Sequence, residues 1–187
     1  MRSHASLQRR PFLTPLWLLA LTAITSAVVL GFAAWAVATA ESTTIVVVRH
    51  AEKVEGAGAD PPLTAAGEAR AALLASMFGD ARQPGHIDAI YVSPALRNRL
   101  TAAPLAARLG LTPTVAPAGD PRSLVRRLLR DHPGGRILVV GHSDTVPDIV
   151  AALTGESIPP IGQEEYGTMY VITVPRFGHA NFLRLNY

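Results

Sequence analysis

The sequence contains no cysteine among its 187 residues. This absence excludes disulfide bridges, thiolate metal sites and a lipid anchor attached through cysteine. Lysine is nearly absent too, because Lys53 is the only one and arginine supplies the other basic side chains. Beyond a high alanine content, the sequence has no internal repeat and no low-complexity tract. Its length suffices for one globular domain and little more.

Charge is missing from a long stretch near the start of the chain, between Arg10 and Glu41. Within it, residues 16–38 are mostly Leu, Ala, Val, Ile, Phe and Trp. This run is long enough to cross a bilayer, which takes roughly 20 apolar residues. It is apolar on all sides, which favours a membrane segment over a buried core helix. Arg2 and Arg9 precede it, and such a basic flank is expected to stay in the cytoplasm.

This segment could be a signal peptide that is cleaved off or a signal anchor that stays in the membrane. The small-x-small pattern of Ala38-Thr39-Ala40 matches the cleavage site of a signal peptide. The apolar run exceeds the ~7–15 residues of a usual signal core, so an uncleaved anchor that enters the membrane through residues 12–38 is an equal alternative. The sequence therefore predicts a signal peptide or signal anchor over 1–40 and one domain over 41–187. That domain is expected outside the cytoplasm, either held at the cell membrane by a single span or periplasmic or secreted after cleavage.

The overall charge suggests a nucleic-acid partner at first sight, because the pI is near 9.8. Of the 17 basic residues, however, three lie within residues 1–40, where there is no acidic residue. The remaining part carries 14 basic and 14 acidic residues, so its net charge is zero. Since the basic surplus belongs to the membrane-targeting segment, no nucleic-acid partner is expected.

Strand-like and helix-like patterns alternate along the exported part. Pro104 lies inside the second of the expected helices and predicts a kink or a break there. The alternation predicts an α/β fold, with a mostly parallel central sheet flanked by helices on both faces. Strands are expected at 44–48, 88–92, 114–115, 137–140, 170–174 and 182–185, and helices at 64–78, 96–109, 123–130 and 146–153.

Polar side chains follow three of these strands at the point where each ends. The first strand ends in Arg49 and His50, and the second is followed by Ser93 and, one helical turn later, Arg97. The strand at 137–140 is followed by a glycine and His142. Because the carboxyl ends of parallel strands share one edge, these side chains are expected to face one pocket. Two arginines and two histidines would suit a phosphoryl group and an in-line nucleophile.

The order of these residues along the chain carries a family resemblance. The chain resembles the histidine phosphatase superfamily, which has the phosphoglycerate-mutase-like fold, and the resemblance covers about residues 44–187. Four motifs carry it: Val48-Arg49-His50-Ala51-Glu52, Leu63-Thr64-Ala65-Ala66-Gly67, Ser93 with Arg97, Thr101 and Ala102, and Gly141-His142.

The resemblance implies a role for each member of the pocket. His50 would be the nucleophile that takes the phosphoryl group, and water would then hydrolyse the phosphohistidine. Arg49, Arg97 and His142 would bind the phosphoryl oxygens. Neighbouring cations favour the neutral imidazole that must attack, so the physical chemistry agrees. Neither a metal nor another cofactor is implied, because the protein's own cations neutralise the charge.

The proton donor is the part that the motifs leave open. Larger members of the superfamily place a glutamate in an inserted segment between the strands that correspond to 88–92 and 137–140, where this chain is short and offers Asp120 as the candidate. Other members carry an aspartate directly after the late histidine, and here Ser143 takes that place with Asp144 one residue later. Asp144 could equally be the cap of the following helix. Glu52 is a further candidate. Two smaller departures, Ala51 for glycine and Leu100 for glutamine, are tolerable.

Three other functions could use some of the same residues. Gly141-His142-Ser143 suggests a serine hydrolase, but Thr145 occupies the last glycine position of the nucleophile elbow. A metal site built on His50, Glu52 and His142 is disfavoured, because two nearby arginines would repel a cation. A non-catalytic phosphate-binding or interaction module would keep the pocket without turnover.

The sequence also limits the substrates. A mutase must exclude water from its phosphorylated intermediate, which takes more covering structure than this short chain offers. Small organic phosphates or phosphorylated envelope glycolipids are the expected substrates, and a phosphoprotein stays open. The segment 163–167 could line the pocket rim, although an ordinary surface loop is favoured there.

Overall fold

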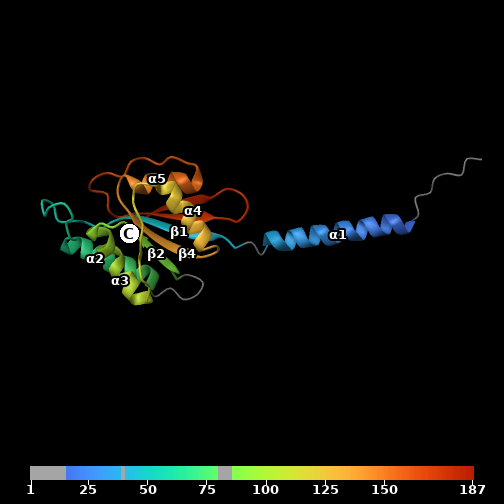
Figure 1. Ribbon diagram of the computed structural model, residues 1–187, viewed down its shortest axis with the longest axis horizontal. Coiled ribbons are helices and arrows are strands. Elements are labelled where there is room, and N and C mark those ends of the chain that lie inside the picture. Colours follow the sequence, from blue (N-terminus) through green and yellow to red (C-terminus); the bar gives the residue numbers. More distant parts are fainter. Residues whose placement is uncertain (1–15, 39–40, 80–85) are drawn as a thin grey trace, which may run out of the picture. The chain divides into compact units, whose positions relative to one another are not determined.

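The computed structural model describes residues 16–38, 41–79 and 86–187. The basic flank, residues 12–15 of the expected span and Thr39-Ala40 of the cleavage pattern lie outside the described residues. The chain divides into two units, residues 1–40 and 41–187. Figure 1 shows their elements: α1 (Leu16–Ala38), β1 (Thr43–Arg49), α2 (Ala65–Gly79), β2 (Ala89–Val92), α3 (Leu96–Leu109), β3 (Thr114–Val115), α4 (Pro121–Asp131), β4 (Arg136–Gly141), α5 (Thr145–Thr154), β5 (Thr168–Val174) and β6 (Asn181–Asn186).

The described part of the first unit is the single helix α1, of 23 residues. At 1.5 Å per residue it is roughly 35 Å long, enough for the ~30 Å hydrocarbon core of a bilayer. Its stretch Trp17–Ala36 has a mean hydropathy of 2.0, and none of it is buried. The hydroxyls of Thr22 and Thr25 donate to the carbonyls of Leu19 and Leu21, so they need no water. By length and composition, α1 can serve as a membrane span or as a signal.

The second unit is built on one six-stranded sheet in the order β3-β2-β4-β1-β5-β6. The four strands from β3 to β1 run parallel, and β5 and β6 extend the sheet antiparallel. The α/β class is therefore confirmed, but the sheet is mixed: its parallel part ends at β1. In the parallel part Arg49 is level with Gly141, and Val92 is level with Val140. The ends of β1, β2 and β4 thus meet at one edge.

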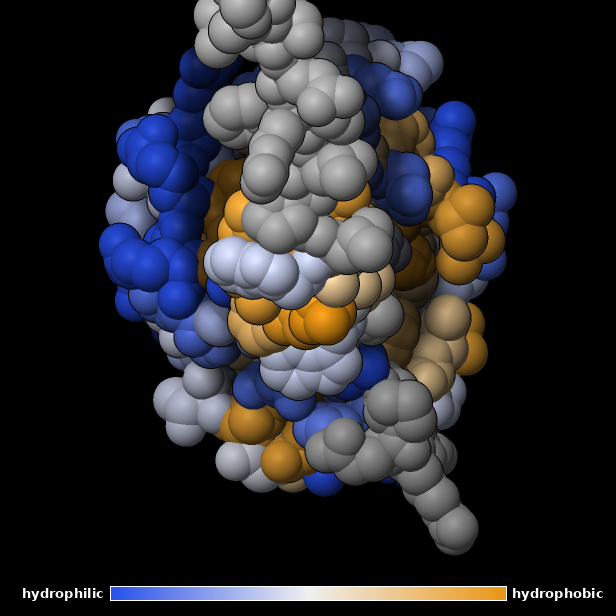
Figure 2. Space-filling model, turned by 90° about the vertical axis from the view of Figure 1, so that its right-hand side faces the viewer, coloured by the Kyte–Doolittle hydropathy of each residue, from blue (hydrophilic) through white to orange (hydrophobic). Residues whose placement is uncertain are grey.

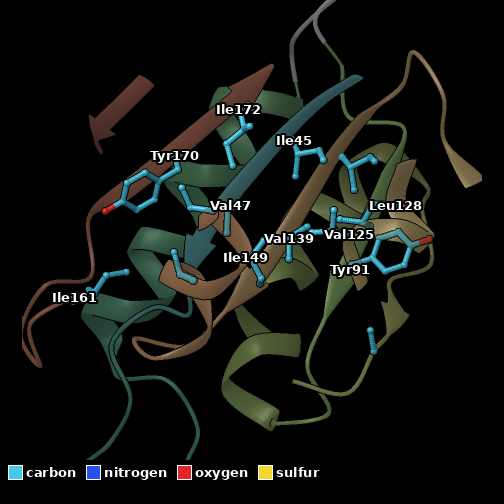
Figure 3. Close-up of a cluster of buried hydrophobic side chains, with 14 residues drawn as sticks. Ile45, Val47, Tyr91, Val125, Leu128, Val139, Ile149, Ile161, Tyr170 and Ile172 are labelled. Atoms are coloured by element: carbon cyan, nitrogen blue, oxygen red, sulfur yellow. The ribbon is translucent and has the colours of Figure 1, made fainter. Parts of the chain in front are cut away.

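Two hydrophobic cores lie on the two faces of the sheet. Alternate residues of a strand point to opposite faces. Ile45 and Val47 belong to the core beneath α4 and α5, together with Leu128 and Ile149 (Figure 3). Their neighbours on β1 belong to the other core, which includes side chains of α2 and α3. In Figure 1 the two helix pairs lie on opposite sides of the sheet. Because both faces are covered, β1 is a nearly continuous run of buried residues.

Most expected elements are found within one or two residues of their expected bounds, and the helix α3 is the informative case. It ends at Gly110, whose φ of 65° is the left-handed conformation that glycine adopts without strain. The break considered at Pro104 does not occur, since α3 runs on to Leu109. Thr101 and Leu105 on either side of Pro104 are fully buried, and this packing holds the helix together despite the lost hydrogen bond.

The Leu-Thr-x-x-Gly motif is explained by packing at the start of α2. The hydroxyl of Thr64 accepts a hydrogen bond from Gly67 N at 3.1 Å and so caps the helix. Thr64 N donates to the carbonyl oxygen of Glu52 at 2.9 Å. A Cβ atom at position 67 would collide with that same oxygen. The motif therefore joins α2 to the segment that follows His50.

Replacing Gly67 by alanine is expected to destabilise the second unit by about 1–3 kcal/mol, because the backbone of Glu52 would have to move. For a domain of this size, the melting temperature should fall by roughly 2–4 °C per kcal/mol. Thermal unfolding of the full chain in detergent measures this. Gly119→Ala is the control, because a Cβ atom there meets nothing within 4 Å. Equal melting temperatures for the two variants would contradict the packing argument.

The surface of the second unit is mixed in polarity. In the space-filling view the most hydrophilic residues gather along the left edge of the molecule (Figure 2). The helix α4 exposes four arginines on its surface. Two of these, Arg127 and Arg130, pair with Asp131 at 3.5 and 2.8 Å. Such exposed pairs contribute little to stability, so α4 is held by its apolar face.

Candidate active site

The carboxyl edge of the parallel strands gathers the side chains that the sequence singled out. His50 N donates to Gly141 O at 2.9 Å, so the chain after β1 continues the ladder with β4 for one more residue. Arg49, His50, Arg97 and His142 all line one pocket of about 530 Å³. Its rim is completed by Lys53, Ser143, Asp144 and Gln163. The expected convergence of the three strand ends is therefore found.

His50 is held as a neutral ring in a defined tautomer. It is 3% exposed, and its Nδ1 lies 2.8 Å from the carbonyl oxygen of Ala51. Since a carbonyl oxygen can only accept, Nδ1 must carry the hydrogen, and Nε2 keeps its lone pair. Burial is the largest cause that lowers the pKa of His50 to about 4; the bond to Ala51 opposes this shift, and the charge of Arg97 adds to it. The imidazole is thus neutral at neutral pH, with a lone pair on Nε2.

We expect the imidazole of His50 to titrate near pH 4, against about 6.5 for an unperturbed histidine. Its folded-state pKa lies below the unfolded value. The neutral ring therefore favours the folded state above pH 6.5, and this contribution is lost as the pH falls from 6.5 to about 4. The measurement is the ring Cε1–H chemical shift against pH, assigned by its loss in His50→Ala. A midpoint near 6.5 would contradict the expected burial effect.

The guanidinium of Arg49 uses Nη1 for contacts within the protein, whereas its Nε has no partner among the described residues. Its side chain is 2% exposed, and its Nη1 donates to the carbonyls of Gly162 and Gln163, both at 2.7 Å, and of Glu165 at 3.2 Å. The guanidinium also stacks 4.0 Å above the ring of Tyr166. Its buried Nε has no hydrogen-bond partner among the described residues. A buried donor without a partner is costly, and an anion in the pocket would supply the acceptor.

Arg97 and His142 form the other side of the pocket. Arg97 Nη2 lies 3.4 Å from His142 Nδ1, and Ser93 Oγ lies 2.8 Å from His142 Nε2. Because a guanidinium only donates, Nδ1 accepts and Nε2–H donates to Ser93. Burial and the charge of Arg97 lower the pKa of His142, and Asp144 opposes this. Arg97 also has a buried Nε without a partner among the described residues, like Arg49.

The remaining motif residues support the pocket without lining it. Thr101 is fully buried; its hydroxyl accepts from Ala51 N at 2.9 Å and donates to the carbonyl of Arg97 at 2.7 Å. Asn98, also fully buried, donates to the carbonyls of Val140 and Gly141 at 2.8 and 3.0 Å. The helix α3 is thereby fixed to the ends of β1 and β4. The sequence pattern named Thr101 but gave no signal for Asn98.

A carboxylate that the sequence reasoning missed contacts Arg97. Asp60 Oδ1 lies 3.7 Å from Arg97 Nη1 and accepts a 2.8 Å hydrogen bond from Leu96 N. Asp60 therefore caps α3 from a distant loop, because Ala95 at the N-cap position has no side-chain acceptor to offer. The Gly- and Pro-rich composition of residues 56–62 is typical of a loop, but it does not indicate which residues the loop contacts.

Of the three acids considered as proton donor, two are engaged elsewhere. Arg70 holds the carboxylate of Glu52 with Nε at 3.0 and 2.9 Å and Nη2 at 2.6 Å. Burial favours a higher pKa for Glu52, but the hydrogen bonds from Arg70 outweigh it, and the pKa is lowered. Asp120 accepts from Ser123 N at 2.9 Å and caps α4. Neither acid lines the pocket of His50.

Asp144 is the acid that lines the pocket. Its expected alternative role as a helix cap is wrong: its backbone is helical, with φ −88° and ψ −37°, and its side chain makes no capping hydrogen bond. Thr145 Oγ1 instead accepts from His142 N at 2.9 Å. The carboxylate of Asp144 is therefore exposed at the rim, beside His142, where its charge opposes the lowering of the pKa of His142 by burial.

The segment 163–167 is more than the ordinary surface loop favoured from its sequence. Gln163 lines the pocket, and Tyr166 is 8% exposed with its ring 6.0 Å from that of His50.

The alternative of a metal site on His50, Glu52 and His142 was also compared with the structure. Within residues 16–38, 41–79 and 86–187, no group of three or more His, Cys, Asp or Glu side chains could hold a metal ion.

Comparison with known protein families gives a match for the part of the chain that carries Arg49, His50 and Arg97. Residues 45–118 match the family described as the histidine phosphatase superfamily, branch 1. This segment of the chain is similar to that superfamily. The matched region holds the strand end with Arg49 and His50 and the helix with Arg97, and the superfamily also contains mutases. The search of curated proteins gave no match.

Several solved structures of phosphatases share the fold of the second unit. The protein histidine phosphatase SixA, complexed with tungstate, has a TM-score of 0.63 at 24% identity, and covers 76% of this chain and 96% of its own. The mycobacterial glucosyl-3-phosphoglycerate phosphatase gives 0.60 at 17% identity, covering 78% and 98%. A phosphoserine phosphatase from Entamoeba histolytica, in complex with phosphoserine, gives 0.58 at 17% identity, covering 77% and 96%. At these identities the likeness concerns the fold alone.

Proposed function

We propose that this protein is a phosphatase that hydrolyses phosphomonoesters through a phosphohistidine formed at His50. One observation carries the proposal: a neutral imidazole with a free Nε2 shares a pocket with two arginines whose buried Nε groups lack acceptors. A phosphoryl group would give both arginines their missing acceptor and give the imidazole its electrophile. The match of residues 45–118 to the histidine phosphatase superfamily, and the phosphatases that share the fold of the second unit, support the same activity.

The first step transfers the phosphoryl group to the protein. The lone pair of His50 Nε2 forms a bond to phosphorus while the bond between phosphorus and the leaving oxygen breaks. Arg49, Arg97 and His142 donate hydrogen bonds to the three non-bridging oxygens, where charge concentrates. His142 does so once its ring turns from Ser93 or gains a second proton. The hydrogen stays on His50 Nδ1, which continues to donate to the carbonyl oxygen of Ala51, and this contact disperses the charge of the phosphorylated ring.

Asp144 is the residue we assign to proton transfer. It would give its proton to the leaving oxygen in the first step. As a carboxylate, it would then take a proton from water that attacks the phosphohistidine, so that the N–P bond breaks and phosphate leaves with the neutral imidazole restored. Its support is its place on the pocket rim and its lack of any competing hydrogen bond among the described residues.

Asp144→Asn is expected to lower kcat/KM for an alkyl phosphate by roughly 10²-fold, because an alkoxide leaves poorly without a proton. An aryl phosphate with a good leaving group should lose less than about tenfold. The measurement is kcat/KM over a series of leaving groups, whose slope should steepen in the variant. Asp148→Asn is the matched control, since Asp148 is an exposed acid on the same helix outside the pocket. Equal losses across the series would remove Asp144 from this role.

The proposed activity is tested by turnover of a generic aryl phosphate by the full chain in detergent from pH 4 to 8. Phosphoryl transfer should give a burst and a phosphorylated protein that rapid quenching captures. Tight phosphate binding without turnover at any pH would instead support a non-catalytic phosphate-binding module. Small phosphate esters, a phosphorylated glycolipid and a phosphohistidine peptide form the substrate panel, since the fold relatives include phosphatases for small molecules and for protein histidine.

We further propose that the phosphatase domain works outside the cytoplasm, behind α1. The helix is long and apolar enough for a span or a signal. Intact mass of the exported protein distinguishes the two, because a mass starting at Glu41 would mean cleavage after Ala40.

A further inference from the structure

The loop of residues 162–166 holds Arg49, and one of its residues, Gln163, also lines the pocket. Three of its carbonyls accept from Arg49 Nη1, and Tyr166 stacks beneath the guanidinium. Main-chain carbonyls can orient an arginine only if the main chain itself is fixed. This loop contains a turn, closed by Glu165 N donating to Gly162 O at 3.1 Å, but it belongs to no helix or strand. Something else must fix it.

The side chain of Glu165 provides that attachment. Its Oε2 accepts from Gly162 N at 3.3 Å, which closes the turn a second time. Its Oε1 accepts from the hydroxyl of Thr168 at 2.6 Å and pairs with Arg184 Nη2. Thr168 is the first residue of β5, and Arg184 lies on β6. Hydrogen bonding to Thr168 is the first cause that lowers the pKa of Glu165, so the carboxylate is charged. One carboxylate thus ties the turn to two strands.

We propose that Glu165, with Arg184 and Thr168, positions Arg49 for phosphate binding through the 162–166 loop. Glu165 touches no reacting atom in this scheme; it is a positioning residue. The chain of contacts runs from Arg184 to Glu165, from Glu165 to the turn, and from the turn carbonyls to Arg49 Nη1. Nη1 is thereby fully used, and Nε is left as a donor in a fixed direction. The inference rests on the proposed phosphate site but not on turnover.

The neighbouring Glu164 provides a matched control for substitutions of Glu165. It lies in the same turn and is exposed, and no hydrogen bond or ion pair of its side chain is seen in the described residues. Removing Glu164 leaves the attachment intact, whereas removing Glu165 releases the turn from β5 and β6. The two substitutions change charge equally, so a long-range charge effect would appear in both.

The experiment measures binding of inorganic phosphate to the full chain by calorimetry, in a double-mutant cycle. Glu165→Ala should weaken binding about tenfold in the wild-type background, the scale of couplings between contacting residues. In an Arg49→Lys background it should change binding less than twofold, because the oriented Nε is already gone. Glu164→Ala should leave binding unchanged in both. Glu165→Gln, which keeps size and part of the hydrogen bonding, should fall between.

A merely structural role for Glu165 would lower the melting temperature without this coupling. Equal losses in the two backgrounds, or no loss in the wild type, would overturn the proposal. Should Glu165→Ala fail to fold, the same cycle is run with Glu165→Gln. Turnover is measured separately on the same samples: phosphate binding with the expected coupling but without turnover would overturn the phosphatase proposal and leave this one standing.

Discussion

Replacing His50 by alanine is expected to lower kcat for an aryl phosphate by roughly 10⁴-fold or more, the scale seen when a covalent nucleophile is removed. The imidazole is neutral and buried, and its Nε2 has no hydrogen-bond partner in the part of the chain that the structure describes. A water molecule in its place would have neither its position nor its nucleophilicity. Steady-state turnover measures the loss, and rapid quenching with a radiolabelled substrate measures the loss of the phosphorylated protein.

Two comparisons keep this result interpretable. His179→Ala removes a histidine from an exposed loop outside the pocket and should leave kcat unchanged. Phosphate affinity should change little in His50→Ala, because Arg49, Arg97 and His142 keep their donors. Unchanged turnover in His50→Ala would refute the covalent mechanism. Lost phosphate affinity together with a lower melting temperature would mean that the substitution had collapsed the pocket.

The second large effect is expected for Arg49→Lys, a change that keeps the charge. Lysine has one nitrogen, and the three carbonyls that now hold Arg49 Nη1 would capture it. No donor would then be left for the phosphoryl oxygens. Loss of one preorganised donor to transition-state charge costs roughly 10²–10³-fold in kcat, and we expect a loss of that size.

The kinetics of Arg49→Lys should separate position from charge. Arg99→Lys, an exposed position on α3, is the matched control and should be silent. If charge alone mattered, Arg49→Lys would keep most of the activity and Arg49→Gln would lose it. We expect the two Arg49 variants to be similarly impaired, with the fall in kcat/KM exceeding about 10²-fold in both.

The pocket could be predicted from the sequence because its main residues sit at strand ends. The run of β-branched residues before Arg49-His50 predicts a strand and the residue at which it ends. The neighbouring parallel strands then bring Arg97 and His142 to the same edge of the sheet. The buried core could be predicted as well, because an almost uninterrupted apolar strand such as β1 must be covered on both faces.

The loop behind Arg49 could not be predicted in the same way. Its position depends on the direction of β5, which runs antiparallel to β1. The residues that lead into β5 therefore lie at the carboxyl edge of β1, beside the pocket. A parallel β5 would have put them at the opposite edge, and strand direction leaves no trace in the composition of Thr168–Val174. Asp60 was missed for a related reason: its partners are 36 residues away in sequence.

The place of Arg184 on β6 has a consequence for the handling of this protein. β6 is the last strand of the sheet, and Leu183 and Leu185 on either side of Arg184 are 65% and 45% exposed. A charge in the middle of an apolar edge strand is a common guard against edge-to-edge aggregation. Removing Arg184 would therefore lower solubility as well as free the turn at Glu165. Substitutions at Glu165 keep Arg184 on the edge strand, so a loss that they cause does not come from edge-to-edge aggregation.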